Sequence, residues 1–462
     1  MNTRRVLFLP AAAISAAFIL LAGLSIEAAT ITWTNTSGGY WSAATNWSPN
    51  RVPTNTDNAL ITSSNTYTVT LDVDENIYSI ITNVANLTLG AGGGAAGVQT
   101  FVVTNLSPSS VFCVSSLLLV TNGGVFLMTN GNMNANSLII DNGGVFNMAA
   151  SSLYGDVTVA SGGVLNATNF NYMFGAMTVA SGGVLNPSPL FLYGPATNSG
   201  TINLTNGPGL SIINNGTTNA QGSLVNQPGG LINFLGDNSG IAGGEGHDYF
   251  VNQGRIIKSA GSGLSVIDVE FATNSGTITA QTGQMVLAGQ WTLLPSGSLN
   301  VGLNSATNYG NFYFSVYSVN IPGNAGLAGA FNATLNNGYV PTNGTPFNVV
   351  SYGSFTGNFS SLGLPAGVMW QSTYGSTNFT LMAKSGKPQF GTFNLSGTNL
   401  TFSGLGGSPG SNYVILASTN LTLPLINWTA LTTNTFDGTG HFNYTNKVIP
   451  GKPQQFFIFK LP

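Results

Sequence analysis

The ionisable side chains of this sequence gather between residues 237 and 270, and this is where the chain could carry out chemistry. Only 5% of all residues are charged, so such a concentration is unusual for this chain. Cleavage of a glycosidic bond needs two carboxyl groups about 5 to 10 Å apart, and elimination needs a base together with a neutralising cation. The stretch contains both kinds of group: Asp237, Glu245, His247, Asp248, Arg255, Lys258, Asp268 and Glu270.

The glycine-rich loop 243–249 lies at the centre of this stretch. It contains Glu245, His247 and Asp248, whose side chains could protrude from such a loop. With Asp237 they are the candidate catalytic residues of a site that acts on polysaccharides. The alternative interpretation is that these charges are solvated and serve only solubility.

A second set of candidates is aromatic. Tyr154, Tyr172 and Tyr193 follow one another at steps of 18 and 21 residues. Rings repeated in this way could form a stripe that binds carbohydrate, because an aromatic ring offers both an apolar face and a polar handle. Packing inside a corner of the fold is the competing interpretation.

We predict neither a metal site nor a cofactor. Asp72, Asp74 and Glu75 could suggest calcium. Two of these acids alternate with apolar residues, which places them on the solvent face of a strand, and the glycine and distal glutamate of an EF-hand loop are missing. The single cysteine, Cys113, excludes an intramolecular disulfide and a zinc site built on paired cysteines.

Four glycine pairs predict the element that must position these residues. Each pair separates two alternating apolar stretches, and successive pairs are 20, 19 and 20 residues apart. The pairs are Gly123-Gly124, Gly143-Gly144, Gly162-Gly163 and Gly182-Gly183. A fixed period near 20 residues with strand-type alternation is the signature of a solenoid. We therefore expect an all-β fold, a parallel right-handed β-helix, in which Asn, Thr and Ser side chains bond along the stack.

Changes in composition divide the chain into five predicted parts. A Trp-rich segment suits the first coil because large aromatic rings can cover an open apolar end. Short strands between turn signals near the C-terminus are typical of a β-sandwich. The parts are a signal peptide (1–29), an N-terminal cap (30–75), repeats of about 20 residues (76–310), a C-terminal β cap (311–384) and a small β-sandwich module (385–462).

The N-terminus and the overall charge predict where the protein works. Arg4 and Arg5 precede an apolar stretch that ends near the small residues Ala28 and Ala29, a pattern typical of a secretory signal. An uncleaved membrane anchor is the alternative. The net charge is only −3 and the ten basic residues are scattered, which argues against nucleic-acid binding. No second long apolar stretch follows, so we expect no membrane span once the signal is removed.

Several segments share their pattern with known proteins. They are the set Trp41, Asn46, Trp47, Pro53, Asp57 and Ile61, the runs 250–256 and 271–278, the stretch 340–383 and the segment around 413–428. These resemble secreted bacterial β-helix surface proteins of the autotransporter-passenger and filamentous-haemagglutinin type, with a small C-terminal β-module. The resemblance implies an extracellular or cell-surface location on a Gram-negative-type bacterium and transfers no catalytic residue. A C-terminal membrane barrel, which an autotransporter requires, does not fit into the last 75 residues or so.

Two functional hypotheses follow. The first is a non-catalytic exported scaffold or adhesin-like protein that binds an extracellular polysaccharide or another component of the cell surface. The second is a polysaccharide lyase or glycoside hydrolase that uses the acidic loop near residue 245. An enzyme requires acids and bases that converge over several coils, whereas a scaffold requires only scattered charges.

Overall fold

The predicted all-β fold and its parallel strands are confirmed by the computed structural model, in which 33 strands form one continuous sheet. Residues described by the structure are 28–63, 65–72, 80–89, 99–104, 111–205, 207–214, 222–244, 246–316, 321–366, 368–384, 388–407, 410–437, 440–448, 451 and 454–461. The predicted signal peptide lies outside these residues up to position 27. Strand β1 begins at Ala29.

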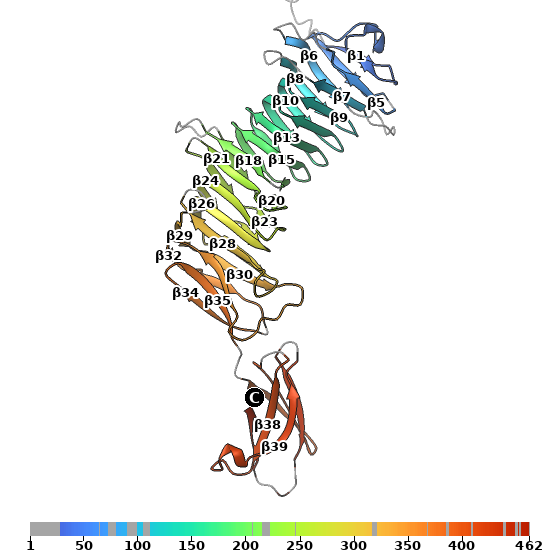
Figure 1. The fold of residues 1–462 in the computed structure, drawn as a ribbon. Coiled ribbons are helices and arrows are strands. Elements are labelled where there is room, and N and C mark those ends of the chain that lie inside the picture. Colours follow the sequence, from blue (N-terminus) through green and yellow to red (C-terminus); the bar gives the residue numbers. More distant parts are fainter. Residues whose placement is uncertain are drawn as a thin grey trace, which may run out of the picture.

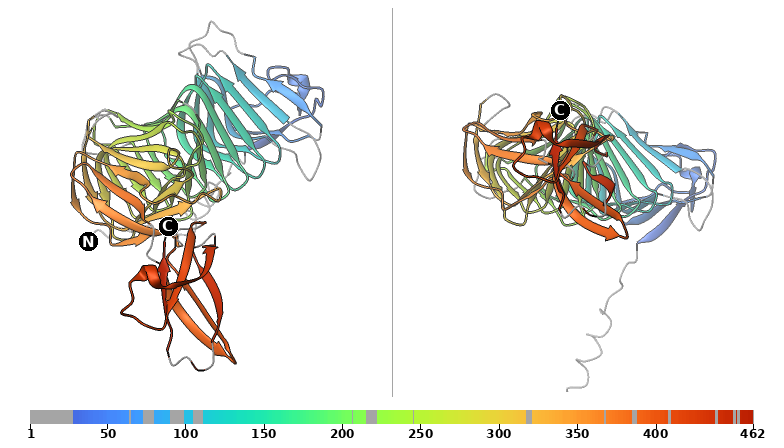
Figure 2. Two further views of the ribbon diagram at one scale, coloured as in Figure 1. Left: turned by 60° about the horizontal axis from the view of Figure 1, so that its bottom comes forward. Right: turned by 90° about the horizontal axis from the view of Figure 1, so that it is seen from below.

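Successive coils of the chain stack into a column, and each coil adds strands to three parallel ladders (Figures 1 and 2). The first ladder contains β1 (Ala29–Trp33), β4 (Asp57–Ile61), β6 (Ile80–Leu89), β8 (Val111–Val120), β10 (Asn132–Ile140), β12 (Ser152–Val159), β14 (Met177–Val179), β16 (Pro195–Asn198), β19 (Ser223–Asn226), β22 (Tyr249–Asn252), β24 (Leu264–Asn274) and β26 (Gly283–Leu293).

The other two ladders share several of these long strands. The second contains β2 (Gly39–Tyr40), β5 (Tyr67–Thr70), β7 (Gln99–Thr104), β9 (Val125–Thr129), β11 (Val145–Ala149), β13 (Val164–Met173), β15 (Val184–Leu192), β17 (Thr201–Leu204), β20 (Leu231–Phe234), β23 (Arg255–Lys258), β25 (Thr277–Ala280), β27 (Ser298–Leu303), β30 (Ala330–Leu335) and β33 (Ser361–Gly363). The third ladder begins with the first parts of β6, β8, β10 and β12, followed by the second parts of β13 and β15. It continues through β18 (Pro208–Ile213), β21 (Gly240–Gly244), β24, β26, β28 (Gly310–Ser315) and β31 (Pro346–Ser351).

The glycine pairs form the turns between the first and second ladders. In the pair Gly162-Gly163 the first glycine has φ 79°, a left-handed conformation that glycine adopts without steric cost. A Cβ on Gly163 would lie 2.1 Å from the carbonyl oxygen of Ile140 in the preceding coil. The repeat of glycine therefore reflects the close approach of each turn to the coil before it.

The core consists of one inward-facing side chain at every second position of the strands. Strand β11 shows the pattern, with Phe146 and Met148 buried between partly exposed neighbours. Equivalent residues stack from coil to coil: the rings of Phe126 and Phe146 are 4.7 Å apart and nearly parallel. Alternation along the strand and repetition between coils thus produce a continuous apolar interior.

Asparagine side chains bond along the stack on the surface, as expected, and they also do so inside the column. On the outside, Asn166 and Asn186 each donate to the asparagine of the preceding coil, at 2.8 and 2.7 Å. A second, fully buried series links Asn198, Asn226, Asn252 and Asn274, with amide-to-amide distances of 2.7 to 2.8 Å. Buried amides are stable only when paired, and this series satisfies them by repetition.

Both ends of the column are covered. At the N-terminal end Trp33, Trp41 and Trp47 are buried and pack edge to face, next to β3 (Trp47–Ser48) and the short helix η1 (Ala44–Asn46). Parallel pairing continues past residue 310 to β31 and β33, and a separate parallel pair is formed by β29 (Asn324–Leu327) and β32 (Ser354–Gly357). The column ends with the antiparallel strands β34 (Met369–Tyr374) and β35 (Asn378–Lys384), of which β35 pairs with β31.

The C-terminal residues form a separate unit, hereafter the terminal module, drawn in red below the column in Figure 1. It has two antiparallel three-stranded sheets that share a core of Phe402, Tyr413, Ile415, Phe436 and Phe442. The elements are β36 (Gln389–Ser396), β37 (Asn399–Leu405), β38 (Asn412–Ser418), η2 (Leu425–Asn427), β39 (Thr429–Thr435), β40 (Phe442–Lys447) and β41 (Phe456–Lys460).

Candidate functional site

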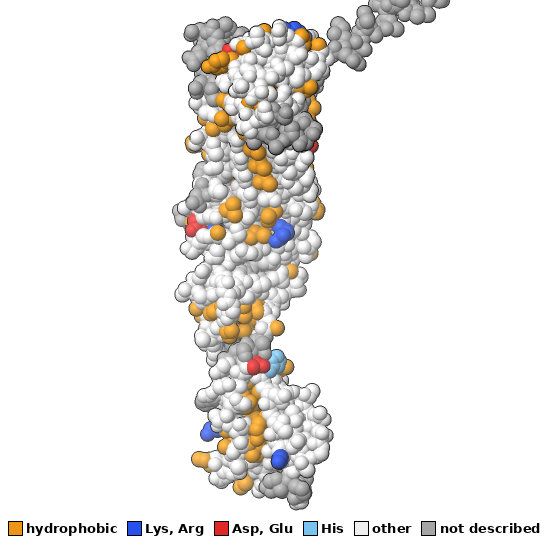
Figure 3. Space-filling model, turned by 90° about the vertical axis from the view of Figure 1, so that its right-hand side faces the viewer, with side chains coloured by type: hydrophobic (Ala, Val, Ile, Leu, Met, Phe, Trp, Pro, Cys, Tyr) orange, Lys and Arg blue, Asp and Glu red, His pale blue; other side chains and the backbone are white. Residues whose placement is uncertain are grey.

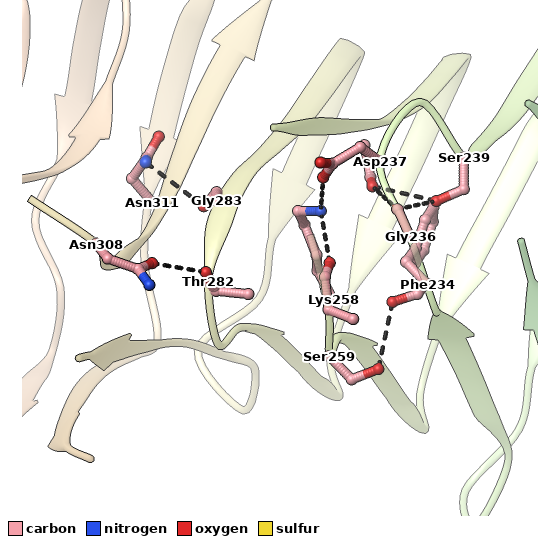
Figure 4. A network of polar contacts seen from close by, with 12 residues as sticks. Phe234, Gly236, Asp237, Ser239, Lys258, Ser259, Thr282, Gly283, Asn308 and Asn311 are labelled. Carbon is pink, nitrogen blue, oxygen red and sulfur yellow. Dashed lines mark hydrogen bonds and ion pairs between the residues drawn. The ribbon is translucent and has the colours of Figure 1, made fainter. Parts of the chain in front are cut away.

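The charged stretch divides into two separate groups, and the first is an ion pair inside the column (Figure 4). Lys258 is the last residue of β23, in register with Phe234 and Ala280, so its side chain occupies a core position and is 0% exposed. Its Nζ donates to Asp237 Oδ1 and to the carbonyl oxygen of Ala260, both at 2.9 Å. The ammonium group therefore has a structural role in the fold.

Asp237 serves as the partner of this buried lysine. The hydrogen bond from Lys258 lowers the pKa of Asp237 below its ordinary value, and the backbone N–H groups of Ser262 and Gly263 act in the same direction. A carboxylate that is ionised and held by three donors is a poor general acid. In the structure Asp237 is thus the ion-pair partner of Lys258.

The second group surrounds Asp248. Burial raises the pKa of Asp248, and the nearby carboxylates of Glu270 and Asp268 add to this effect. A raised pKa is what a general acid needs, but Asp248 is only 4% exposed and its Oδ1 accepts the N–H of Gly244 at 3.1 Å. A polymer lying on the surface therefore has little access to this carboxyl group.

His247 and Glu270 hold the same loop against the next coil. The backbone N–H of His247 donates to the carboxylate of Glu270, and its carbonyl oxygen accepts from Asn214 Nδ2 at 2.8 Å. The candidate Glu245 lies outside the described residues. Arg255 starts β23 with an exposed side chain. Among the described members of the predicted acidic site, Asp237, Asp248 and Glu270 thus accept hydrogen bonds from neighbouring parts of the fold, whereas Arg255 is exposed.

The tyrosine candidates, in contrast, come together on the surface. Tyr154 stacks on Phe174 with a centroid distance of 4.6 Å and an interplanar angle of 5°, and Phe174 stacks on Tyr193 at 4.9 Å. Beside this stack of rings, Tyr172 stacks on Phe191 with a centroid distance of 5.1 Å. We call the whole set the aromatic patch; its members are Tyr154, Phe170, Tyr172, Phe174, Phe191 and Tyr193.

The backbone register explains why these rings meet. Leu153 pairs with Met173 and Met173 with Leu192 in the third ladder, so the residues that follow them stand above one another on adjacent coils. Tyr154, Phe170 and Phe174 are 40%, 60% and 39% exposed. Large exposed apolar side chains that lie together are a typical sign of an interaction surface.

A polar hollow lies on the coils that precede the aromatic patch, and no residue of the patch lines it. It measures about 330 Å³ and is lined by Cys113, Val114, Ser115, Asn134 and Asn136. Asn134 is the residue in register with Tyr154 on the preceding coil. The hollow therefore lies on the two coils before Tyr154, whereas Phe174 belongs to the coil after it.

The chemistry of the hollow suits binding more than reaction. Burial raises the pKa of the Cys113 thiol, which keeps it protonated and weakly nucleophilic near neutral pH. The remaining polar side chains are amides and a hydroxyl, which donate and accept hydrogen bonds without ionising. No acid or base lines the hollow within the described part of the chain.

Two further hollows lie close to charged side chains. One of about 410 Å³ lies beside Glu270 and Trp291, and one of about 570 Å³ lies in the terminal module beside Asp437 and His441. The His441 Nδ1 atom is 4.0 Å from Asp437 Oδ1, and both side chains are exposed. Neither hollow joins the candidates named from the sequence into one constellation.

Among the described residues, no group of three or more His, Cys, Asp or Glu side chains is arranged to hold a metal ion. No helix in the described part of the chain has the length and apolarity needed to cross a membrane.

No family model matches the chain, and no curated protein is significantly similar to it.

Proposed function

We propose that this protein is exported and acts outside the cell, or on its surface, as a non-catalytic, adhesin-like binding scaffold. Its column would be a right-handed parallel β-helix, because connections between parallel strands of one sheet are right-handed in about 98% of cases. Such a column spaces equivalent side chains of neighbouring coils about 4.8 Å apart. That spacing gives an extended, regular surface, which suits a polymer better than a small molecule.

The aromatic patch beside its polar hollow is the observation that carries the proposal. Tyr154 stacks on Phe174 of the following coil, and Asn134 and Asn136 of the hollow belong to the preceding coil. An apolar ring face combined with a few fixed amides is a typical arrangement for ligand binding. A sugar ring presents the complementary surface, with apolar C–H groups on its face and hydroxyl groups at its edge.

The lack of charged side chains in the hollow restricts the class of ligand that would suit it. No ionisable side chain other than the protonated Cys113 lines it in the described structure, so a neutral polysaccharide suits it better than an acidic one. The sparse charge on the column agrees with this, since Figure 3 shows mostly uncharged polar surface on the face drawn. We therefore propose neutral polysaccharide as the ligand class.

A non-catalytic role is supported by the way the described acids are used. Asp237 neutralises the buried Lys258, and Asp248 holds the turn at Gly244. An enzyme that acts on a polysaccharide would need such groups to face an open groove.

Binding of the mature chain to a panel of neutral and acidic polysaccharides by affinity electrophoresis tests the proposal. We expect retardation by at least one neutral polysaccharide, and a loss of about tenfold in affinity for Tyr154→Ala, a typical cost of removing an aromatic anchor. Tyr40→Ala is the matched control, because Tyr40 is exposed at 62% and lies outside the patch.

Two results would contradict the proposal. One is wild-type protein that binds no member of the panel, including polysaccharide from the surface of the producing cell. The other is release of reducing or unsaturated sugar ends that Asp248→Asn abolishes, which would favour the lyase or hydrolase alternative.

A further inference from the structure

The end of the terminal module that points away from the column carries an unusual group of apolar side chains. Strands β36, β38 and β40 run toward this end, because the chain enters the module at β36 and each of the paired neighbours is antiparallel. The loop between β38 and β39, which includes η2, therefore lies there, as Figure 1 shows at the bottom of the module. We call this end the distal tip; its apolar residues are Leu395, Leu421, Leu423, Leu425 and Ile426.

These side chains face solvent. Ile426 is 91% exposed, and Leu395, Leu421 and Leu425 are each more than half exposed. Isolated exposed leucines are common on proteins, but four aliphatic side chains within six residues of one loop are not. The tip is also convex, since an isoleucine at 91% exposure has almost no neighbours.

The loop that presents them is firmly built. The indole Nε1 of Trp428, a largely buried residue, donates to the carbonyl oxygen of Leu423 at 3.0 Å, and its backbone N–H donates to that of Leu425 at 3.1 Å. The amide oxygen of Asn420 accepts the N–H of Thr422 at 2.9 Å. The exposure of the aliphatic groups is thus fixed by hydrogen bonds on both sides of the loop.

Charge around the tip is of one sign. Residues 389–462 contain a single acid, Asp437, and three lysines, at positions 447, 452 and 460. Asp437 lies at the opposite end of the module, after β39, whereas Lys447 ends β40 at the tip with an exposed side chain. Lys460 lies toward the other end, and position 452 is outside the described residues.

We propose that the distal tip inserts into the surface of an anionic lipid membrane. A convex apolar loop needs no complementary pocket in a bilayer, since acyl chains adapt to its shape, and a nearby lysine is attracted to anionic headgroups. The tip would then anchor the module while the column projects from the surface. This proposal concerns retention at a surface and is independent of polysaccharide binding by the aromatic patch.

Flotation of the mature full-length chain with vesicles tests the insertion. We use phosphatidylcholine vesicles with and without about one third phosphatidylglycerol. We expect wild-type protein to float with the anionic vesicles and to bind less at high salt. The double variant Leu425→Asp, Ile426→Asp should lose at least tenfold in binding, and Lys447→Glu should weaken binding to anionic vesicles only.

Leu405→Asp is the matched control, because Leu405 is exposed at 58% and ends β37 near the linker, at the other end of the module. It should float like wild type. Near-ultraviolet circular dichroism reports on the packing of all the aromatic side chains, Trp428 included, and the single variant Ile426→Ser replaces the double variant if the spectrum of the double variant differs from that of wild type.

The proposal is overturned if wild-type protein floats with neither kind of vesicle, as it would if the tip binds another protein. It is also overturned if Leu405→Asp loses binding as much as the tip variants do. Failure here is distinguishable from failure of the proposed function: Tyr154→Ala should float normally, and the tip variants should still bind polysaccharide.

Discussion

At the scale of single residues, the described charged side chains are used to hold the chain together. Lys258 lies wholly inside the column and pairs with Asp237, with 35% of the aspartate side chain exposed. The two residues therefore differ in how strongly each depends on the other for its charge to be stabilised. Loss of the aspartate leaves a buried ammonium group without its counterion, whereas loss of the lysine leaves a carboxylate that water can still reach.

This inequality gives the first prediction. Asp237→Ala should lower the thermal unfolding midpoint by several degrees, and Lys258→Met should lower it much less because methionine fits a core position. Melting followed by circular dichroism measures both variants. Equal losses, or a larger loss for Lys258→Met, would show that the pair is not organised as described.

A second ion pair fastens the N-terminal cap. Arg51 binds the Asp57 carboxylate through Nη1 at 2.6 Å and Nη2 at 2.7 Å, and Thr54 donates from both its backbone N–H and its hydroxyl. The hydrogen bonds from Arg51 hold the pKa of Asp57 far below its ordinary value. Because the folded pKa is lower than the unfolded one, the stabilisation is complete above about pH 4 and is lost as the pH falls.

Asp57→Asn should therefore be less stable than wild type at neutral pH, and the difference should shrink as the pH falls from about 4 to 2. Melting midpoints of both proteins at a series of pH values provide the measurement. A difference that stays constant with pH would rule out the ionised carboxylate as the source.

At the scale of elements, the turn and the ladder are the repeating devices. The second glycine of each pair lies against a backbone carbonyl of the preceding coil, as with Gly163 and Ile140. Backbone atoms cannot move aside without breaking the parallel ladder, so a methyl group at this position forces two coils apart.

We predict that Gly163→Ala destabilises the protein by about 1–3 kcal/mol, the usual cost of overpacking. Gly326→Ala serves as control, because a Cβ at Gly326 meets no atom within 4 Å and the residue lies in a strand. Urea unfolding of both variants measures the difference in stability. Similar midpoints for the two variants would contradict the close approach of Gly163 to the preceding coil.

Much of this organisation could be predicted from the sequence because it repeats. The glycine pairs revealed the period, and the alternating apolar residues between them, such as Phe146 and Met148, are the ones found in the core. The capping role expected for Trp33, Trp41 and Trp47 agrees with their burial at the N-terminal end. The buried asparagine series was not anticipated, although the recurring Asn-x-Gly pattern at Asn252 and Asn274 contained the signal.

The candidate site was only partly predictable. The sequence prediction considered only tyrosines and linked Tyr154, Tyr172 and Tyr193. The stack of rings in the structure also contains Phe174, which lies 20 residues after Tyr154. A search for any aromatic residue at the coil period would have found it. The burial of Lys258 could not be foreseen, because the pairing of Asp237 with it depends on a loop between two coils.

At the scale of the whole molecule, the protein is a stacked column with few charged residues. Hydrogen bonds run from coil to coil along three faces, and aromatic residues cover the N-terminal end and antiparallel strands the other. Each outer position is repeated on the next coil, so a surface feature such as the aromatic patch extends across several coils. The proposed binding function requires this stacking to be real and in register.

Disulfide cross-linking between neighbouring coils tests that requirement most directly. Thr178 and Thr197 are Cα partners on successive coils, and their hydroxyl oxygens are 3.4 Å apart. With Cys113→Ser as background, Thr178→Cys and Thr197→Cys should form a disulfide rapidly under mild oxidation, because paired neighbours satisfy its geometry. The pair Thr178→Cys and Asn203→Cys, whose second residue lies on another face, should not. Efficient cross-linking of the second pair, or none of the first, would contradict the stacked-coil account.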